Sequence, residues 1–387
     1  MKNDTLKLTD QQVLEYARAG LEEHLPLQAE GYICSADDVR HVLLGVSVKG
    51  ATIESVCAEM DGTPDTETIR QYVNDQVTVE TLPEWRESLN AALAAQIPAR
   101  VWRQARDLAI DFHDRPYYGK ASPEEGLWVR GKAKKGTTRF HRVITAYVIL
   151  SGLRVTLAMD FVLPGSETVP LLTGLLHRVQ ALGIEVKRLF LDKGFASIEV
   201  MRYLFQQGLP ALIACPIRGK TGGTRALCRG NKSHLATHTF KGQSGTFTAQ
   251  LAVCRVFTTA SRTGRMQRRA DWLVFVVIHL DLSPRQARRL YRRRFGVETS
   301  YRCAGQVRGW TTSQNPAYRF LLIGLSFFLL NLWLLLRWLF AQVPRRGHRE
   351  LDVKRFQLTR FASFIAHALE QRYGCVYEII APAAPRL

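Results

Sequence analysis

The order of the apolar segments between residues 106 and 217 constrains the fold more than any other feature of this chain. DLAIDF, RFHRVITAYVIL and RVTLAMDFVLP are β-rich, and the SGL between the last two is typical of a hairpin turn. Two segments with helical periodicity follow, over 169–183 and 197–208, and each is followed by another apolar strand. The order strand, strand, strand, helix, strand, helix, strand predicts an α/β fold in which helices cover a mixed sheet.

The rest of the chain divides around this segment. Helical periodicity dominates before residue 100, while 218–269 is rich in glycine and basic residues around a strand-like stretch. We interpret that region as a β-rich insertion that reaches DNA; a solvated loop is the alternative. The expected domains are a helical N-terminal domain (1–105), the first part of the α/β domain (106–217), the basic β-rich insertion (218–269), the second part of the α/β domain (270–345) and a C-terminal tail or helix (346–387).

Charge is distributed unevenly along the chain. The formal net charge is +19, yet residues 1–100 hold 8 Lys/Arg and 17 Asp/Glu, so the remainder holds 45 basic and 17 acidic side chains. A positive field of that size predicts a polyanionic partner, most simply nucleic acid. A generally basic enzyme is the alternative.

The cysteines and the N-terminus indicate the compartment. Seven scattered cysteines without a C-x-x-C pair are typical of reduced thiols, and MKNDTLKLTD is too polar for a signal peptide. We therefore expect a cytoplasmic protein. Cys228, His234 and His238 lie close together, but their spacing fits no standard zinc finger, so we do not expect a zinc site there.

One apolar run, over 320–338, is at the lower limit of membrane-spanning length. Asn331 interrupts it, and Arg319 and Arg337 lie at its ends. We expect a buried core helix and no membrane contact; a membrane anchor is the alternative.

Two short helices around DGTP (61–64) have the outline of a helix-turn-helix. We expect Thr63 to cap the second helix, Pro64 to occupy its first position, and Arg70 to face DNA. Because this region is acidic, a plain helical or dimerisation domain is the alternative.

Three carboxylates stand out as metal ligands. Asp111 and Asp192 are each expected to end a strand, and Glu298 lies on a later helix. An all-oxygen site of this kind suits Mg²⁺ or Mn²⁺. Two such ions, about 4 Å apart, can activate a water or hydroxyl on one side of a phosphate and stabilise the leaving oxygen on the other. The absence of a G-x-x-x-x-G-K-[ST] segment makes a nucleotide-driven motor an unlikely class.

The helix around Glu298 is dense in arginine. Tyr291, Arg294 and Glu298 have i, i+3, i+7 spacing, which predicts one shared face, and Arg302 extends it. A guanidinium beside a metal site suits bidentate phosphate contact. The alternative is a surface helix in which Glu298 simply pairs with Arg294.

Three segments together resemble a known family, the DDE transposases of insertion sequences. They are AIDFHDRPYYGK, LFLDKGF and YRRRFGVE, the last of which matches the family's tyrosine, two residues, arginine, three residues, glutamate pattern. The carboxylates are separated by 81 and 106 residues. The likeness covers about residues 106–340, and it implies a ribonuclease H-like catalytic domain.

The resemblance also implies roles for particular residues. Asp111, Asp192 and Glu298 would be the catalytic triad that binds two Mg²⁺ or Mn²⁺ ions, while Tyr291 and Arg294 would grip the DNA end. The family pattern has a lysine seven residues after the glutamate, where this chain has Gly305.

Other basic residues are candidates for DNA contact. Arg302 or Arg308 would replace the missing lysine. The basic loop that contains Lys132, Lys134 and Lys135 is expected to contact phosphates. Asp114, close to Asp111, is the alternative first ligand.

The implied function is a DNA transposase that cleaves the terminal inverted repeats of its own element and joins them to target DNA. Pairing of two ends implies a homodimer on DNA, located at the nucleoid in the cytoplasm. A metal-dependent nuclease of the same fold, which cuts without joining, is the first alternative. A DNA-binding protein with a decayed catalytic site is the second, because of Gly305.

Overall fold

The chain divides into two compact units. The computed structural model describes residues 7–29, 31–97, 101, 104–150, 153–220, 222–262, 265–343, 350–352, 354–376 and 378. Unit 1 comprises Met1–Ile97, Pro116–His141 and Ser300–Leu387, and unit 2 comprises Pro98–Arg115 and Arg142–Thr299. The units differ from the expected linear domains in that two later segments belong with the N-terminal helices.

Unit 1 begins with five helices: α1 (Asp10–His24), α2 (Ala36–Lys49), α3 (Ile53–Glu59), α4 (Thr66–Gln76) and α5 (Leu82–Ala95). Thr9 and Ser35 form capping boxes that satisfy the first backbone N–H groups of α1 and α2. The N-cap of α4 is Asp65, whose side chain accepts from Glu67 N. The expected cap at Thr63 is therefore wrong by two residues, because an aspartate directly before the helix serves as the cap.

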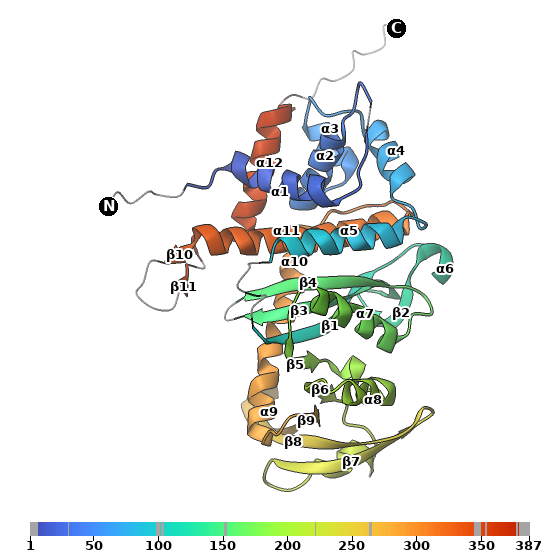
Figure 1. The fold of residues 1–387 in the computed structure, drawn as a ribbon, viewed down its shortest axis with the longest axis vertical. Coiled ribbons are helices and arrows are strands. Elements are labelled where there is room, and N and C mark those ends of the chain that lie inside the picture. Colours follow the sequence, from blue (N-terminus) through green and yellow to red (C-terminus); the bar gives the residue numbers. More distant parts are fainter. Residues whose placement is uncertain are drawn as a thin grey trace. The chain divides into compact units, whose positions relative to one another are not determined.

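The C-terminal helix α12 (Leu358–Tyr373) packs against α1 and α2 (Figure 1). The Tyr373 hydroxyl donates to Asp38 at 2.8 Å, and Lys49 pairs with Glu370 at 2.8 Å. These contacts join α12 to α2.

The apolar run forms α11 (Pro316–Phe340), which packs along α5 in unit 1. At Gly324 an added Cβ would overlap the Leu89 side chain, so glycine permits the close approach of the two helices. The helix is long and apolar enough to cross a membrane, but 89% of its most apolar window is buried inside the protein. Such burial is what the core-helix interpretation predicts.

The basic loop forms a hairpin in unit 1. β2 (Val129–Lys134) pairs antiparallel with the first residues of β3 (Thr137–Leu150). Lys135 and Gly136 between them have φ of 52° and 79°, as in a two-residue hairpin turn that matches the twist of the strands. The remaining short elements of this unit are α6 (Pro123–Gly126), β10 (Gln342–Val343) and β11 (Glu350–Leu351).

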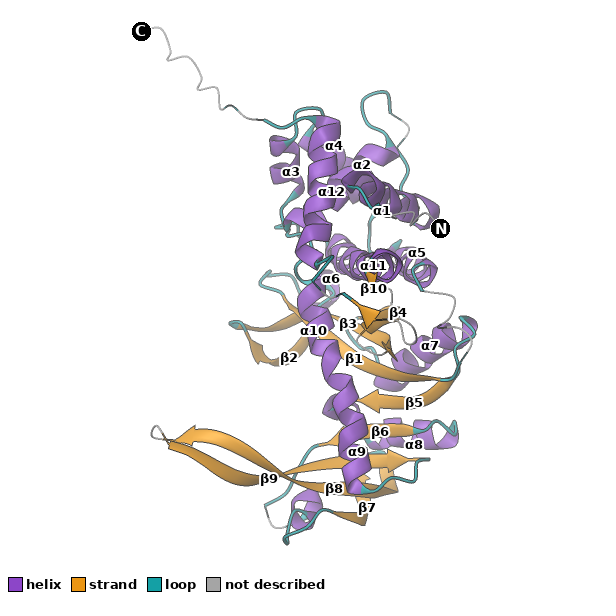
Figure 2. Ribbon diagram, turned by 90° about the vertical axis from the view of Figure 1, so that its left-hand side faces the viewer, coloured by secondary structure: helices purple, strands orange, loops and turns teal. Residues whose placement is uncertain are grey.

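Unit 2 is built on a mixed sheet, in agreement with the predicted fold class. Its strands run in the order β4, β3, β1, β5, β6, β9, β8, β7, and β1, β5 and β6 are parallel. Figures 1 and 2 show α7 and α8 on one face of this sheet and α9 on the other. The bounds are β1 (Arg106–Pro116), β4 (Leu153–Val162), α7 (Thr168–Ala181), β5 (Val186–Leu191), α8 (Ile198–Gln206), β6 (Ala211–Cys215), β7 (His234–Gly242), β8 (Gly245–Arg262), β9 (Arg265–Ile278) and α9 (Pro284–Tyr291).

The basic region after β6 continues this sheet. β9 runs through the expected boundary at 269/270 and pairs with β6 on one side and β8 on the other. β7 then pairs with β8 at the edge. The region is β-rich as expected, and its strands extend the central sheet.

The helix that carries the arginine-rich stretch is not continuous. Ser283 caps α9 in a capping box with Gln286, and Pro284 occupies its first turn, as predicted. After Tyr291 the chain forms a 3₁₀ turn, η4 (Arg292–Phe295), and then α10 (Gly296–Ala304). This change of helix type determines where the candidate ligands point.

Candidate active site

Asp111 and Asp192 lie side by side on adjacent parallel strands. Ile110 on β1 is the register partner of Leu191 on β5, so the residue after each is an aspartate at the same level of the sheet. The preceding residues of both strands are fully buried, which fixes this register. The sequence suggested that Asp111 ends its strand. That prediction is wrong, because β1 continues to Pro116. Asp192 directly follows β5, as predicted.

Asp111 is a buried carboxylate with a guanidinium beside it. Only 8% of the residue is exposed, and Arg294 Nη2 lies 2.7 Å from its Oδ2. Its Oδ1 accepts from the Phe112 backbone N–H at 3.0 Å. Burial raises the pKa of Asp111 to about 6; the nearby charge of Asp192 adds to the rise, and Arg294 opposes it. A buried carboxyl with so high a pKa beside a second carboxylate is typical of a functional site.

Tyr291 and Arg294 fix the helical segment against this edge of the sheet. The Tyr291 hydroxyl donates to the Leu191 carbonyl at 3.2 Å, and its ring packs on Phe275 with centroids 4.7 Å apart. The Arg294 guanidinium lies 5.9 Å from the Tyr291 ring centroid. Nε of Arg294 has no hydrogen-bond partner among the residues that the structure describes. The guanidinium thus retains a donor for a ligand while it neutralises Asp111.

Glu298 does not join the two aspartates. It lies in the first turn of α10 and is exposed, whereas Tyr291 and Arg294 are buried. Within the described part of the chain, no three Asp, Glu, His or Cys side chains are close enough to hold a metal ion. The prediction that Tyr291, Arg294 and Glu298 share one face is therefore wrong for Glu298.

The pair of aspartates fits one hard divalent cation. Mg²⁺ commonly takes one or two protein carboxylates and fills its remaining positions with water and substrate phosphate oxygens. Asp111 and Asp192 supply two such carboxylates from rigid strands. A second ion needs a further oxygen ligand, which Glu298 does not provide in this arrangement.

A second ion cluster close by was not predicted. Asp107 is buried on β1, and Arg188 on β5 binds it through two hydrogen bonds of 2.7 and 2.9 Å. Arg293 also pairs with Asp107, so this arginine binds a carboxylate. One sequence feature could have predicted this cluster. Each of two neighbouring apolar strands carries a charged residue near its start, and these two residues, Asp107 and Arg188, are partners in the register.

Asp114, the alternative first ligand, is engaged elsewhere. Arg142 binds both of its carboxylate oxygens, at 2.5 and 3.2 Å, and lies over the Phe112 ring. Asp111 also pairs with an arginine, but it lies at the level of Asp192 on the neighbouring strand, which makes it the better candidate for the first ligand.

The predicted DNA-binding residues other than Tyr291 and Arg294 are exposed. Lys132, Lys134 and Lys135 lie on the β2–β3 hairpin, and Arg302 lies on α10. Arg70 lies on α4 and forms a long ion pair of 3.5 Å with Glu67. Their exposure leaves them accessible to a ligand.

Comparison with known proteins agrees with this architecture. A family model described as "Transposase DDE domain" matches residues 102–332, more than half of the chain. A search of the curated proteins finds no match. Among solved structures, the chain is similar to a piggyBac transposase synaptic complex with hairpin DNA, with a TM-score of 0.55 and 11% identity, over 97% of this chain and 80% of that one. At that identity the likeness concerns the fold, which is ribonuclease H-like. By its sequence match over the sheet and the following helices, the chain belongs to the family of DDE transposases.

Proposed function

We propose that this protein cleaves the ends of its own insertion sequence and joins them to target DNA by phosphodiester hydrolysis and transesterification. The observation that carries the proposal is the register of β1 and β5, which sets Asp111 beside Asp192 in a domain of the DDE transposase family.

Asp111 and Asp192 would hold the divalent cation, Mg²⁺ or Mn²⁺, by their carboxylates. Glu298 would join them only after α10 or its side chain is repositioned, and would complete a site for two ions. Bound there, the cations would activate the attacking water or hydroxyl and stabilise the leaving oxygen.

Arg294 would have two roles at this site. Its guanidinium lies 2.7 Å from the Asp111 carboxylate and neutralises it. With Asp111 engaged by a cation, Arg294 would be free to contact the scissile phosphate, a ligand suited to bidentate arginine contact. Tyr291, held by the Leu191 carbonyl, would keep this helical segment in place.

DNA is the proposed partner. The basic balance of residues 101–387 supports binding of the phosphate backbone, and the structurally similar piggyBac complex contains hairpin DNA. The exposed cations Arg70, Lys132, Lys134, Lys135 and Arg302 are the proposed contacts. Pairing of two element ends would require a homodimer on DNA, and such a protein would act at the nucleoid of the cytoplasm.

A cleavage assay tests the proposal. The substrate is a plasmid that carries the gene with its flanking DNA, incubated with the full chain and Mg²⁺. Asp192→Asn is expected to lower cleavage about a thousandfold, because several kcal/mol of charge stabilisation is lost, and to leave DNA affinity nearly unchanged.

The matched control is Asp281→Asn, which changes an exposed aspartate of the same unit and should cut normally. Full cleavage by Asp192→Asn in Mg²⁺ would refute the assignment. Cut ends that are never joined to a second plasmid would favour a nuclease of the same fold.

A further inference from the structure

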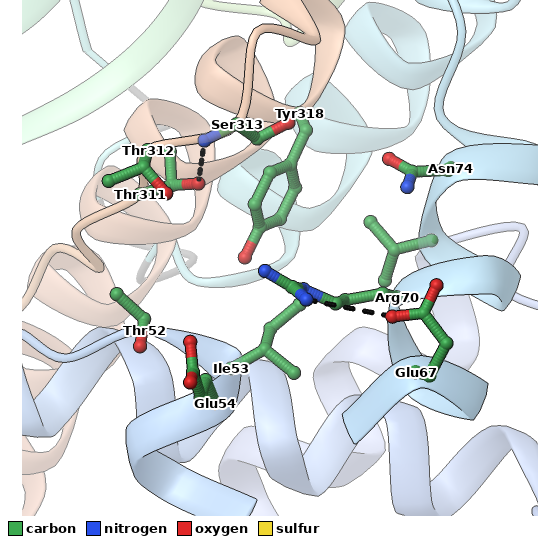
Figure 3. A pocket seen from close by; sticks show the side chains of 11 residues that line it. Thr52, Ile53, Glu54, Glu67, Arg70, Asn74, Thr311, Thr312, Ser313 and Tyr318 are labelled. Atoms are coloured by element: carbon green, nitrogen blue, oxygen red, sulfur yellow. Dashed lines mark hydrogen bonds and ion pairs between the residues drawn. The ribbon is translucent and has the colours of Figure 1, made fainter. Parts of the chain in front are cut away.

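A polar pocket of about 220 Å³ lies within unit 1 (Figure 3). It is bounded by the start of α3, one face of α4 and the segment that leads into α11. The lining side chains are those of Thr52, Ile53, Glu54, Glu67, Arg70, Val73, Asn74, Thr311, Thr312, Ser313 and Tyr318.

Tyr318 contributes a buried hydroxyl to this pocket. The residue is 3% exposed, and its hydroxyl has no hydrogen-bond partner within the described ranges of the chain. Burial raises the pKa of Tyr318, so the hydroxyl keeps its proton and can donate. Figure 3 shows it directed toward Arg70. A buried hydroxyl without a partner is costly, and a ligand that accepts a hydrogen bond from it would remove that cost.

The other polar groups offer both donors and acceptors. Arg70 and Glu67 form only a long, exposed ion pair, so both remain available to a ligand. The Asn74 amide adds a donor and an acceptor. One guanidinium and two carboxylates, Glu54 and Glu67, disfavour a free phosphate group. They favour a neutral ligand that presents donors on one edge and acceptors on another.

The size of the pocket narrows the ligand further. The volume corresponds to about seven water molecules at their share of liquid volume, and it is below the roughly 300–1,000 Å³ of drug-sized sites. A single planar ring system suits such a space better than a whole nucleotide.

We propose that this pocket binds a single unpaired nucleobase of the DNA, with guanine as the best-matched base; this rests on the proposed function, which supplies the DNA. Guanine presents O6 and N7 acceptors, which an arginine binds bidentately, and an N2 amino donor for a carboxylate. Arg70 would take the first edge and Glu54 or Glu67 the second. A base inside a duplex could not reach the buried Tyr318 hydroxyl, so the base must be unpaired or turned out of the stack.

A comparison of two short single strands tests the proposal. Fluorescein-labelled oligothymidine with one central guanine, and the same strand with thymidine there, are titrated with the full chain without divalent cation. Fluorescence anisotropy should show about tenfold tighter binding of the guanine strand. Tyr318→Phe, which removes only the hydroxyl, and Arg70→Gln, at an exposed position, should each reduce that preference toward equality. Arg360→Gln, the same change at an exposed arginine of α12, should retain it.

Two further measurements distinguish failure of this proposal from failure of the proposed function. Guanosine should compete for the guanine strand, whereas inorganic phosphate at the same concentration should not; competition by phosphate alone would overturn the nucleobase assignment. Equal affinity for both strands in the unmodified protein would overturn this proposal and leave the proposed cleavage function standing. If neither strand binds, the DNA-binding part of the proposed function fails. Saturation-transfer NMR with guanosine then tests the pocket alone. A guanosine signal that is lost in Tyr318→Phe would support the nucleobase site, and the absence of any signal in the unmodified protein would overturn it.

Discussion

Two parts of unit 2 that carry candidate ligands differ in how they are positioned. Asp111 and Asp192 are held by the hydrogen bonds of neighbouring parallel strands. Glu298 depends on a helix that begins only at Gly296 and leaves the carboxylate exposed. The structure therefore holds the two strand carboxylates side by side, while the carboxylate on the helix does not join them.

The physical origin of the difference is the 3₁₀ turn. An α-helix turns about 100° per residue and a 3₁₀ helix about 120°, so the four residues of η4 add roughly 80° of rotation. Tyr291 and Glu298 would be about 20° apart around a continuous α-helix, and the added rotation makes this about 60°. Strand pairing contains no comparable source of drift over one or two residues.

The largest expected effect concerns Glu298, the candidate ligand on the helix. Glu298→Gln should lower cleavage about a thousandfold if Glu298 joins the aspartates during catalysis, because the second ion then loses a ligand. Its free energy of unfolding should change by less than about 0.5 kcal/mol, because the side chain is exposed. Cleavage and urea unfolding measure the two quantities. Normal cleavage would show that the two strand aspartates suffice.

Removal of the Arg294 guanidinium, which lies beside the buried Asp111, should lower the free energy of unfolding by an amount that depends on pH. The folded-state pKa of Asp111, about 6, lies above its ordinary value of 3.8. The stability from this group is therefore complete below pH 4 and lost as pH rises through about 6. Arg294→Met should raise that pKa further and extend the loss to higher pH. We expect about 3 kcal/mol of destabilisation at pH 8 and clearly less at pH 5.5.

Urea unfolding at both pH values measures this difference, with Arg292→Met, at an exposed arginine of the same turn, as the control. An equal loss at pH 5.5 and pH 8 would mean that Arg294 stabilises by packing rather than by its charge.

In the absence of DNA, cation affinity should depend on Asp111 and Asp192 and not on Glu298. Because the carboxylate must be ionised, Mn²⁺ affinity should fall about tenfold per pH unit below about pH 6, as measured by electron paramagnetic resonance. Glu298→Gln should leave this affinity within about twofold, since Glu298 is exposed and, among the described residues, forms no metal-binding group with the two aspartates. A constant affinity between pH 5 and pH 7 would argue against Asp111 as a ligand.

The smallest effects are expected at the exposed lysines of the β2–β3 hairpin. Single changes Lys132→Gln, Lys134→Gln and Lys135→Gln should each weaken DNA binding a few-fold and reduce the salt dependence by about one charge. Binding at several salt concentrations gives the slope. A loss of base preference in these variants would contradict a pure phosphate contact.

Sequence patterns determined the local elements of this protein. Strand periodicity, helix periodicity and caps such as Ser283 predicted the mixed sheet and the start of α9, and short apolar strands identified Asp111 and Asp192. These features depend on residues a few positions apart, so they can be read from the chain.

Only the tertiary structure decided which distant residues meet. It set Arg294 on Asp111, Arg188 and Arg293 on Asp107, and the C-terminal helix α12 on α1 and α2. It also left Glu298 exposed by placing a 3₁₀ turn where the spacing suggested a continuous α-helix. Contacts between residues from about 80 to 360 positions apart follow from how whole elements pack and desolvate charge. No local period of the sequence encodes that packing.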